Sequence, residues 1–461
     1  MKPVHRQYYA AFCANLPTIL YGIFISWSSP NIPLLQSIET PLESPLNDHE
    51  ASWIAAVGGF GGLLSTFICG WLLDKIGRKK TLILIGVPQA LCWMLILTGR
   101  NGRHLLIARI LGGLSGGGAF TVVPVFISEI SDDDHRGVLG TIFSVSCNFG
   151  IMLGFILSTI FDYHVVPLIV LSVAVLYLIG ILFVRESPKF LEMQGKSGDE
   201  IVESSKYYTG QEIIELELNS KEKIEKDKKT VSITDFKQPS YWKPTILNLI
   251  TITFCTTSGT FVIICFTKQI LDEAGSDISS DYGSIFIAFI QLLGSYCASI
   301  AIERAGRKPL LLTSAVLSCL SLTIMGSYYY LKSLGFDEIS TFSVTPLVCV
   351  SFLFFIVSIG VSTVPMVYAC EILPTEIRGF IFTLCMAELW TLIILGVRYF
   401  MTMVDVLGMH GFLWFFASTS LLTSIFIGVF LPETKGKSIE AIAGLFTSKP
   451  IKGLRCFSSR V

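Results

Sequence analysis

Twelve apolar stretches alternate with shorter polar segments along the chain. A helix needs roughly 20 apolar residues to cross the hydrocarbon core of a bilayer, so each stretch predicts one transmembrane helix. The predicted helices cover about residues 8–28, 52–73, 81–99, 104–128, 138–160, 165–184, 243–270, 282–302, 309–331, 342–369, 379–404 and 411–431. The pattern therefore predicts an all-α membrane protein with twelve transmembrane helices.

The polar segments divide this series of helices into two sets of six. Residues 185–242 contain many Lys, Glu and Ser side chains, and the stretch from Glu212 to Lys229 predicts helices that lie under the membrane. The predicted parts are a six-helix N-terminal half (1–184), a cytoplasmic helical linker (185–242), a six-helix C-terminal half (243–431) and a cytoplasmic tail (432–461).

A charged motif occurs once in each half. Asp74 precedes a Gly-Arg-Lys triplet at 77–79, and Glu303 precedes the same triplet at 306–308 with the same spacing. A glycine between two helices predicts a turn with positive φ, because only glycine adopts that conformation freely. The recurrence of acid, glycine and base at equal offsets indicates an internal repeat, and hence two related halves.

A second pair of opposite charges also recurs. Glu129 precedes Arg136 by seven residues, and Glu371 precedes Arg378 by seven residues. All these charges fall at one predicted side of the membrane, where they could pair across the halves and close an inner gate. Alternatively, each pair could be local and only hold its own turn. The candidate gate residues are Asp74, Arg78, Glu129, Arg136, Glu303, Arg307, Glu371 and Arg378.

Composition supports the membrane assignment. Apolar residues make up 52% of the chain, charged residues 15%, and the mean hydropathy is +0.65. Soluble domains carry about 25% charged residues. If both termini are cytoplasmic, all but six of the Lys and Arg residues lie on the inner side, as the positive-inside rule requires. The exceptions are Arg100, Arg103, Arg109, Lys268, Lys332 and Arg398.

The sequence lacks the patterns of catalytic and metal-binding chemistry. We find no cluster of Ser, His and Asp, and the twelve cysteines show no metal-ligand spacing. The glycine-rich run at 112–118 is not followed by Gly-Lys-Ser/Thr, which argues against a phosphate loop. We therefore expect no enzyme activity, no catalytic residues, no metal, no cofactor and no nucleic-acid partner.

Several motifs together resemble the sugar porter family of the major facilitator superfamily. They are the two Gly-Arg-Lys triplets, the two Glu-x6-Arg-Gly pairs, Arg185–Leu191 and Pro432–Ser438. Two further segments, Trp27–Pro33 and Glu50–Ile54, resemble the branch of insect facilitated trehalose transporter-like proteins. The resemblance implies a carrier in the plasma membrane that moves a hexose or a trehalose-like disaccharide by alternating access, without covalent chemistry.

The resemblance also indicates where a sugar would bind. The family has amide side chains at the positions of Asn148 and Gln291 and a tryptophan at the position of Trp390. The amides that the family has in the seventh predicted helix (243–270) and its tryptophan in the tenth (342–369) are replaced by other residues here. Glu388 is added because an ionisable residue at membrane depth is a functional candidate. The candidate substrate-binding residues are Asn148, Cys255, Thr256, Phe261, Gln291, Met366, Glu388 and Trp390. Asn148 and Gln291 could equally be structural hydrogen-bond partners between helices.

Proton coupling is judged from one further position. Family members that are proton symporters carry an Asp at the position of Phe24, near the arginine that corresponds to Arg109. Because phenylalanine cannot take up a proton, the sequence favours a uniporter. The alternatives are a carrier of a non-sugar small solute and a transporter-derived sensor or receptor, since three or more amides of the family site are missing.

Overall fold

The computed structural model describes residues 3–131, 133–196, 198–208, 238–275, 278–336, 342–373 and 375–435. Side chains are described throughout these ranges except at 133–138, 240, 303, 370, 375 and 376. All regular structure in the described ranges is helical. Twelve segments there are long and apolar enough to cross a membrane, in agreement with the predicted number.

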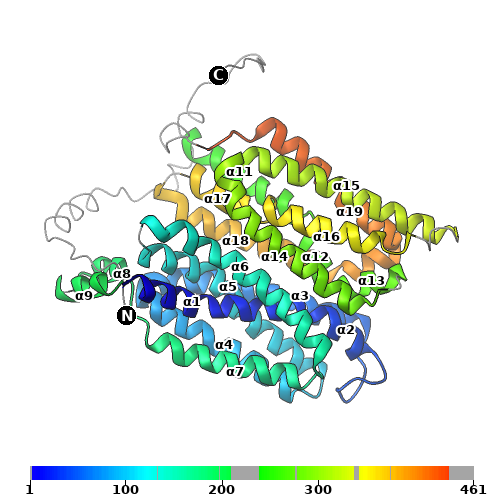
Figure 1. Ribbon diagram of the computed structural model, residues 1–461, viewed down its shortest axis with the longest axis horizontal. Helices are drawn as coiled ribbons and strands as arrows, with labels where there is room; N and C mark the ends of the chain where they lie inside the picture. Colours follow the sequence, from blue (N-terminus) through cyan, green and yellow to red (C-terminus); the bar gives the residue numbers. More distant parts are fainter. Residues whose placement is uncertain are drawn as a thin grey trace, which may run out of the picture.

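The helices form two groups, which lie one above the other in Figure 1. The N-terminal group contains α1 (Pro3–Ser26), α2 (Ser28–Gln36), α3 (Asp48–Ile76), α4 (Arg78–Thr98), α5 (Gly102–Ile130), α6 (Asp133–Ile160) and α7 (Val165–Leu182). The C-terminal group contains α11 (Pro239–Thr256), α12 (Thr260–Cys265), α13 (Thr267–Ala274), α14 (Ser280–Ala305), α15 (Arg307–Ser333), α16 (Thr345–Ile359), α17 (Val364–Ile372), α18 (Thr375–Arg398) and α19 (Phe400–Phe430).

Two short helices, α8 (Pro188–Met193) and α9 (Gly198–Tyr208), lie beside the N-terminus at one end of the bundle (Figure 1). We call this the linker end, and the opposite end, which carries α2 and α13, the α2 end. The Gln7 side-chain amide donates to the Tyr208 carbonyl over 2.8 Å, and the Tyr208 hydroxyl donates to the Arg185 carbonyl over 2.7 Å. These bonds fasten α9 to α1 and to the segment that follows α7. The helices predicted between Glu212 and Lys229 lie outside the described residues.

Three boundaries differ from those predicted by more than five residues. Residues 28–36, expected as a loop, form α2, because Trp27 keeps helical angles (φ −53°, ψ −32°) and the Asn31 amide donates to its carbonyl. The predicted helix 379–404 ends at Arg398, and α19 begins at Phe400 and bends at Gly408 (φ 71°). Positive φ at a glycine interrupts the helical path without a steric penalty.

Two predicted helices are broken in the middle. The helix expected at 243–270 is divided into α11, α12 and α13, with Gly259 in the left-handed conformation (φ 80°) at the first break. The helix expected at 342–369 is divided into α16 and α17. Ser314 of α15 covers this second break, since its hydroxyl donates to the Ile356 carbonyl (2.7 Å) and accepts from the Val361 N–H (3.3 Å).

Glycines allow the helices of the N-terminal half to cross at very short distances. A Cβ atom at Gly61 of α3 would lie 2.1 Å from the Ile110 carbonyl oxygen of α5, and one at Gly113 would lie 1.8 Å from the Gly58 carbonyl oxygen. No side chain can replace hydrogen at such a contact between two backbones. The glycine-rich runs in the second and fourth predicted helices are therefore explained by this crossing.

Candidate functional site: the interface between the two halves

A buried network of charges joins helices within the N-terminal half at the linker end. Arg78 at the start of α4 forms a 2.8 Å ion pair with Glu129 of α5, and both side chains are about 5% exposed (5% and 6%). The Ser187 hydroxyl donates to the other Glu129 oxygen over 2.5 Å. Next to it, the Glu186 carboxylate accepts the backbone N–H groups of Arg78 and Lys79 over 3.0 Å, where the α4 dipole favours a negative charge.

The C-terminal half repeats this network. Arg307 at the start of α15 forms a 2.6 Å ion pair with Glu371 of α17, and the Thr434 hydroxyl donates to Glu371 over 2.6 Å. The Glu433 carboxylate accepts the N–H groups of Arg307 and Lys308 over 3.0 Å. The predicted internal repeat is thus present at the level of individual hydrogen bonds.

The position of Glu433 changes its acidity. Burial raises the pKa of this carboxyl, but four backbone N–H groups donate to it and together hold its pKa below the usual range. A carboxylate that accepts several backbone N–H groups is stabilised in its charged form. The charged form of Glu433 is therefore favoured beside the start of α15.

Sequence reasoning missed four members of the two networks. Glu186 with Ser187 and Glu433 with Thr434 were recognised only as parts of family motifs. The signal was nevertheless present, because an acid followed by a hydroxyl residue occurs directly after the sixth helix of each half.

Where both side chains are described, the gate charges pair in neither of the two ways considered from the sequence. Both ion pairs join different helices of the same half, and neither joins Glu129 or Glu371 to the arginine seven residues later. Arg378 instead donates to the Leu373 carbonyl over 3.1 Å, and Asp74 is exposed without an ion pair to the described residues. The side chains of Arg136 and Glu303 lie outside the described residues.

The halves approach each other at the α2 end. The Lys268 N–H donates to the Ser29 hydroxyl over 2.8 Å, and the Arg398 guanidinium lies 5.1 Å from the centre of the Trp53 ring. The Lys268 ammonium also forms a 2.6 Å ion pair with Asp281 of α14. These contacts hold α2 and α3 against α13 and α18.

Toward the linker end the same helices separate. A Cβ atom at Gly59 of α3 would lie 2.6 Å from Ile394 of α18, whereas one at Gly70 would have no atom within 4 Å. Gly70 lies on the same side of α3 as Gly59, since eleven residues make slightly more than three helical turns. The interface is therefore closed at the α2 end and open toward the linker end.

Asn148 and Gln291 meet across the halves at mid-depth. The Gln291 amide of α14 donates to the Asn148 amide oxygen of α6 over 3.0 Å, and the Gln291 side-chain oxygen is buried without a described hydrogen-bond partner. Trp390 of α18, 2% exposed, contacts Tyr21 and Phe120 of the other half, and its ring centre lies 6.1 and 5.9 Å from theirs. Three of the eight predicted substrate-binding residues therefore lie at the contact between the halves.

Four other predicted residues lie in the two broken helices. Cys255 and Thr256 end α11 just before the Gly259 break, and Phe261 follows it in α12. Met366 lies in α17, directly after the second break. In transporters, discontinuous helices form substrate sites because the break exposes backbone groups near the bilayer midplane. Sequence periodicity alone did not reveal either break.

Glu388 lies apart from the other candidates. Two residues along an α-helix correspond to a rotation of about 200°, so Glu388 and Trp390 point to nearly opposite sides of α18. The Thr253 hydroxyl of α11 donates to one Glu388 oxygen, and the other oxygen is buried without a described partner. The structure thus separates Glu388 from the contact between the halves.

Arg109 is a buried charge held by neutral groups. Its guanidinium donates to the Ile54 and Phe24 carbonyl oxygens and to the Ser28 hydroxyl, over 3.0, 2.6 and 2.8 Å. Its central carbon lies 3.8 Å from the centre of the Phe24 ring, an arrangement that stabilises the cation. Phe24 therefore occupies the place next to Arg109 where the family resemblance implies an aspartate in proton symporters.

Comparison with known proteins identifies the family. Residues 12–446 match the family described as "Sugar (and other) transporter". The chain is 27% identical over 449 residues to the facilitated trehalose transporter Tret1 of Culex quinquefasciatus, covering 96% of this chain and 86% of that protein. It is 29% identical over 445 residues to Tret1 of Drosophila virilis, covering 95% of this chain but 48% of that protein. The chain thus spans about half the length of several relatives that it matches.

The fold agrees with this assignment. The partially occluded, inward-open structure of the Escherichia coli xylose transporter XylE superimposes with a TM-score of 0.77 at 18% identity, covering 94% of this chain and 100% of that chain. At this identity the likeness establishes the fold alone. Because residues 12–446 match that family and the described residues contain twelve candidate membrane spans, the chain belongs to the sugar transporter family, a family of transporters and not of enzymes.

Proposed function

We propose that this protein is a facilitative sugar carrier, a uniporter for a hexose or a trehalose-like disaccharide. The observation that carries the proposal is the Asn148–Gln291 amide pair, which joins the halves at mid-depth, and the Trp390 ring also contacts the other half. Amides offer donor and acceptor together, which suits sugar hydroxyls, and an indole ring suits the apolar face of a sugar. A substrate that inserts between Asn148 and Gln291 would replace their mutual bond.

The direct test is uptake by oocytes that express the chain, with labelled glucose, fructose, trehalose and polyols. We expect saturable uptake of one sugar, because the amide pair, the tryptophan and both broken helices are present. Cys255, Thr256 and Phe261 supply fewer polar groups than amides would, so a smaller or more apolar solute is the second candidate. If the protein reaches the surface and moves none of these compounds, a non-sugar carrier or a sensor replaces the sugar carrier.

We expect Asn148→Ala and Gln291→Ala to raise the KM for the transported sugar about fivefold or more, since each lost hydrogen bond contributes about 1 kcal/mol. Asn248→Ala is the matched control. Its amide donates to Cys385 over 3.2 Å inside the C-terminal half, so its loss should lower stability without changing KM. If Asn148→Ala lowers only the midpoint of thermal unfolding and leaves KM unchanged, the pair is structural.

Transport should not depend on a proton gradient. Phe24 cannot take up a proton, Arg109 is neutralised by no described carboxylate, and Glu388 points away from the halves' contact. We therefore expect equal uptake with and without an imposed pH gradient, in the unmodified protein and in Glu388→Gln. Accumulation driven by the gradient and abolished by Glu388→Gln would refute uniport.

The charge networks are proposed to form the inner gate. The arrangement described is open toward the linker end, and among described groups Arg378 donates to the carbonyl of Leu373, which follows α17 in the same half. We propose that Arg378 crosses to the network of Glu129 when this end closes. Arg378→Gln should then slow transport and increase labelling from the linker end at an unchanged unfolding midpoint. Unchanged transport and labelling would exclude the gate.

The orientation proposed is that of a plasma-membrane carrier with both termini and the linker end in the cytoplasm. It rests on the basic residues at that end, including Arg78, Lys79, Arg307 and Lys308. Antibody access to tags at either terminus, in intact and in permeabilised cells, tests it. Staining of the tags in intact cells would show that the termini lie outside and that the proposed orientation is wrong.

A further inference from the structure

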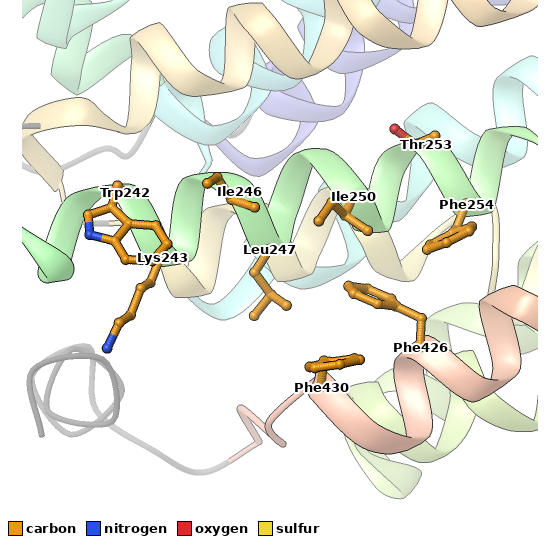
Figure 2. A pocket seen from close by; sticks show the side chains of 9 residues that line it. All are labelled: Trp242, Lys243, Ile246, Leu247, Ile250, Thr253, Phe254, Phe426 and Phe430. Atoms are coloured by element: carbon orange, nitrogen blue, oxygen red, sulfur yellow. The ribbon is translucent and has the colours of Figure 1, made fainter. Parts of the chain in front are cut away.

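A groove runs along the outside of the C-terminal half between α11 and α19 (Figure 2). It has a volume of about 630 Å³, and its walls include Leu247, Ile250 and Phe254 of α11 and Phe426 and Phe430 of α19. Phe430 is 62% exposed although it lies in a membrane-spanning segment. The groove therefore faces the bilayer and not the contact between the halves.

The groove exists because the two helices are joined at only one end. The Thr423 hydroxyl of α19 donates to the Phe254 carbonyl over 3.1 Å, and the Thr419 hydroxyl donates to the Thr257 carbonyl over 2.7 Å. From Phe254 toward the linker end, the helices diverge and leave apolar walls between them. In a bilayer, such a space is filled by hydrocarbon, because water there would find no polar partner.

The length of the groove matches one leaflet. Lys243 and Phe254 are eleven residues apart on α11, which corresponds to about 16 Å of helix. Half of the hydrocarbon core of a bilayer measures about 15 Å. The groove thus reaches from the membrane surface at the linker end to the middle of the bilayer, where the Phe254 and Phe426 rings close it with centres 5.2 Å apart.

The surface end of the groove is polar and basic. Trp242, 42% exposed, and Lys243 lie there, with the Lys243 ammonium 6.0 Å from the centre of the Trp242 ring (Figure 2). Tryptophan prefers the headgroup level of a membrane, and a basic side chain at that level attracts anionic lipids. We propose that the groove binds one acyl chain of an anionic phospholipid, with the phosphate of the headgroup at Lys243.

Native mass spectrometry of the full chain, released from mixed nanodiscs of phosphatidylcholine and phosphatidylglycerol, tests the proposal. The unmodified protein should retain phosphatidylglycerol in preference to phosphatidylcholine, and Lys243→Gln should reduce that preference about fivefold. Lys75→Gln is the matched control, because Lys75 lies 5.6 Å from the Trp71 ring but outside the groove. It should leave the preference unchanged.

A second variant tests the site of the acyl chain. Leu247→Trp fills the groove with an indole ring, so it should remove the retained lipid while Lys243 stays in place. Equal retention of both lipids by the unmodified protein, or the same preference in Lys243→Gln, would overturn the proposal. A preference that appears only after truncation at Lys435 would overturn it too, since the chain's own residues 436–461 would then be the occupant.

Discussion

Replacing Gly61 by alanine should lower the free energy of unfolding by about 3 kcal/mol or more, the upper end of what overpacking costs. The added methyl group would lie 2.1 Å from the Ile110 carbonyl oxygen and 2.7 Å from the Leu114 backbone nitrogen. Both are backbone atoms, so no change of rotamer relieves the overlap and α3 must move away from α5. The midpoint of thermal unfolding and the yield of monodisperse protein in detergent measure the effect.

Gly70→Ala is the matched control, since it makes the same substitution in the same helix. A Cβ atom at Gly70 has no atom within 4 Å, and alanine favours a helix over glycine by about 1 kcal/mol. The unfolding midpoint should therefore stay the same or rise. If Gly61→Ala and Gly70→Ala behave alike, the close crossing of α3 and α5 is not what stabilises the N-terminal half.

Glu129→Gln should have the second large effect. The side chains of Arg78 and Glu129 are 5% and 6% exposed. The substitution therefore leaves the buried guanidinium charge of Arg78 without its partner. Breaking a buried ion pair in this way costs about 3–5 kcal/mol. The midpoint of thermal unfolding should fall clearly, and cysteine labelling from the linker end should show a loosened contact between α4 and α5.

The repeat supplies a comparison for this result. Glu371→Gln removes the same charge from the Arg307 pair, whose side chains are 18% and 25% exposed and therefore better solvated. Its unfolding midpoint should fall less than that of Glu129→Gln, because water screens the remaining charge. An equal or larger fall for Glu371→Gln would mean that burial does not decide the strength of the two networks.

Part of the site could be predicted because it depends on local sequence. The Gly-Arg-Lys triplets predicted turns with positive φ, and Gly77 and Gly306 have φ values of 98° and 91°. Asn148, Gln291 and Trp390 were selected from family motifs, and the structure places all three at the contact between the halves. The two turns are confirmed because the conformation of a turn glycine depends on its immediate neighbours. The substrate-binding role of the other three residues stays a prediction.

The partners of the charges could not be predicted. Glu129 recurs with Arg136 along the chain, yet its ion pair is with Arg78, 51 residues away, because the crossing of α4 and α5 brings these two side chains together. Glu388 likewise was grouped with Trp390, two positions later. The two side chains point to nearly opposite sides of α18, so Glu388 accepts a hydrogen bond from Thr253 of α11 instead.

The sequence by itself determined the membrane class, the number of spans and the duplication of the two halves. Hydrophobic length and repeated motifs are properties of short segments, and the bilayer requires helices wherever such segments occur. Only the tertiary structure decided where α11 and α16 end, which charges pair, and which end of the interface is closed. Those features depend on how helices from distant parts of the chain rotate and cross, and no local pattern records that geometry.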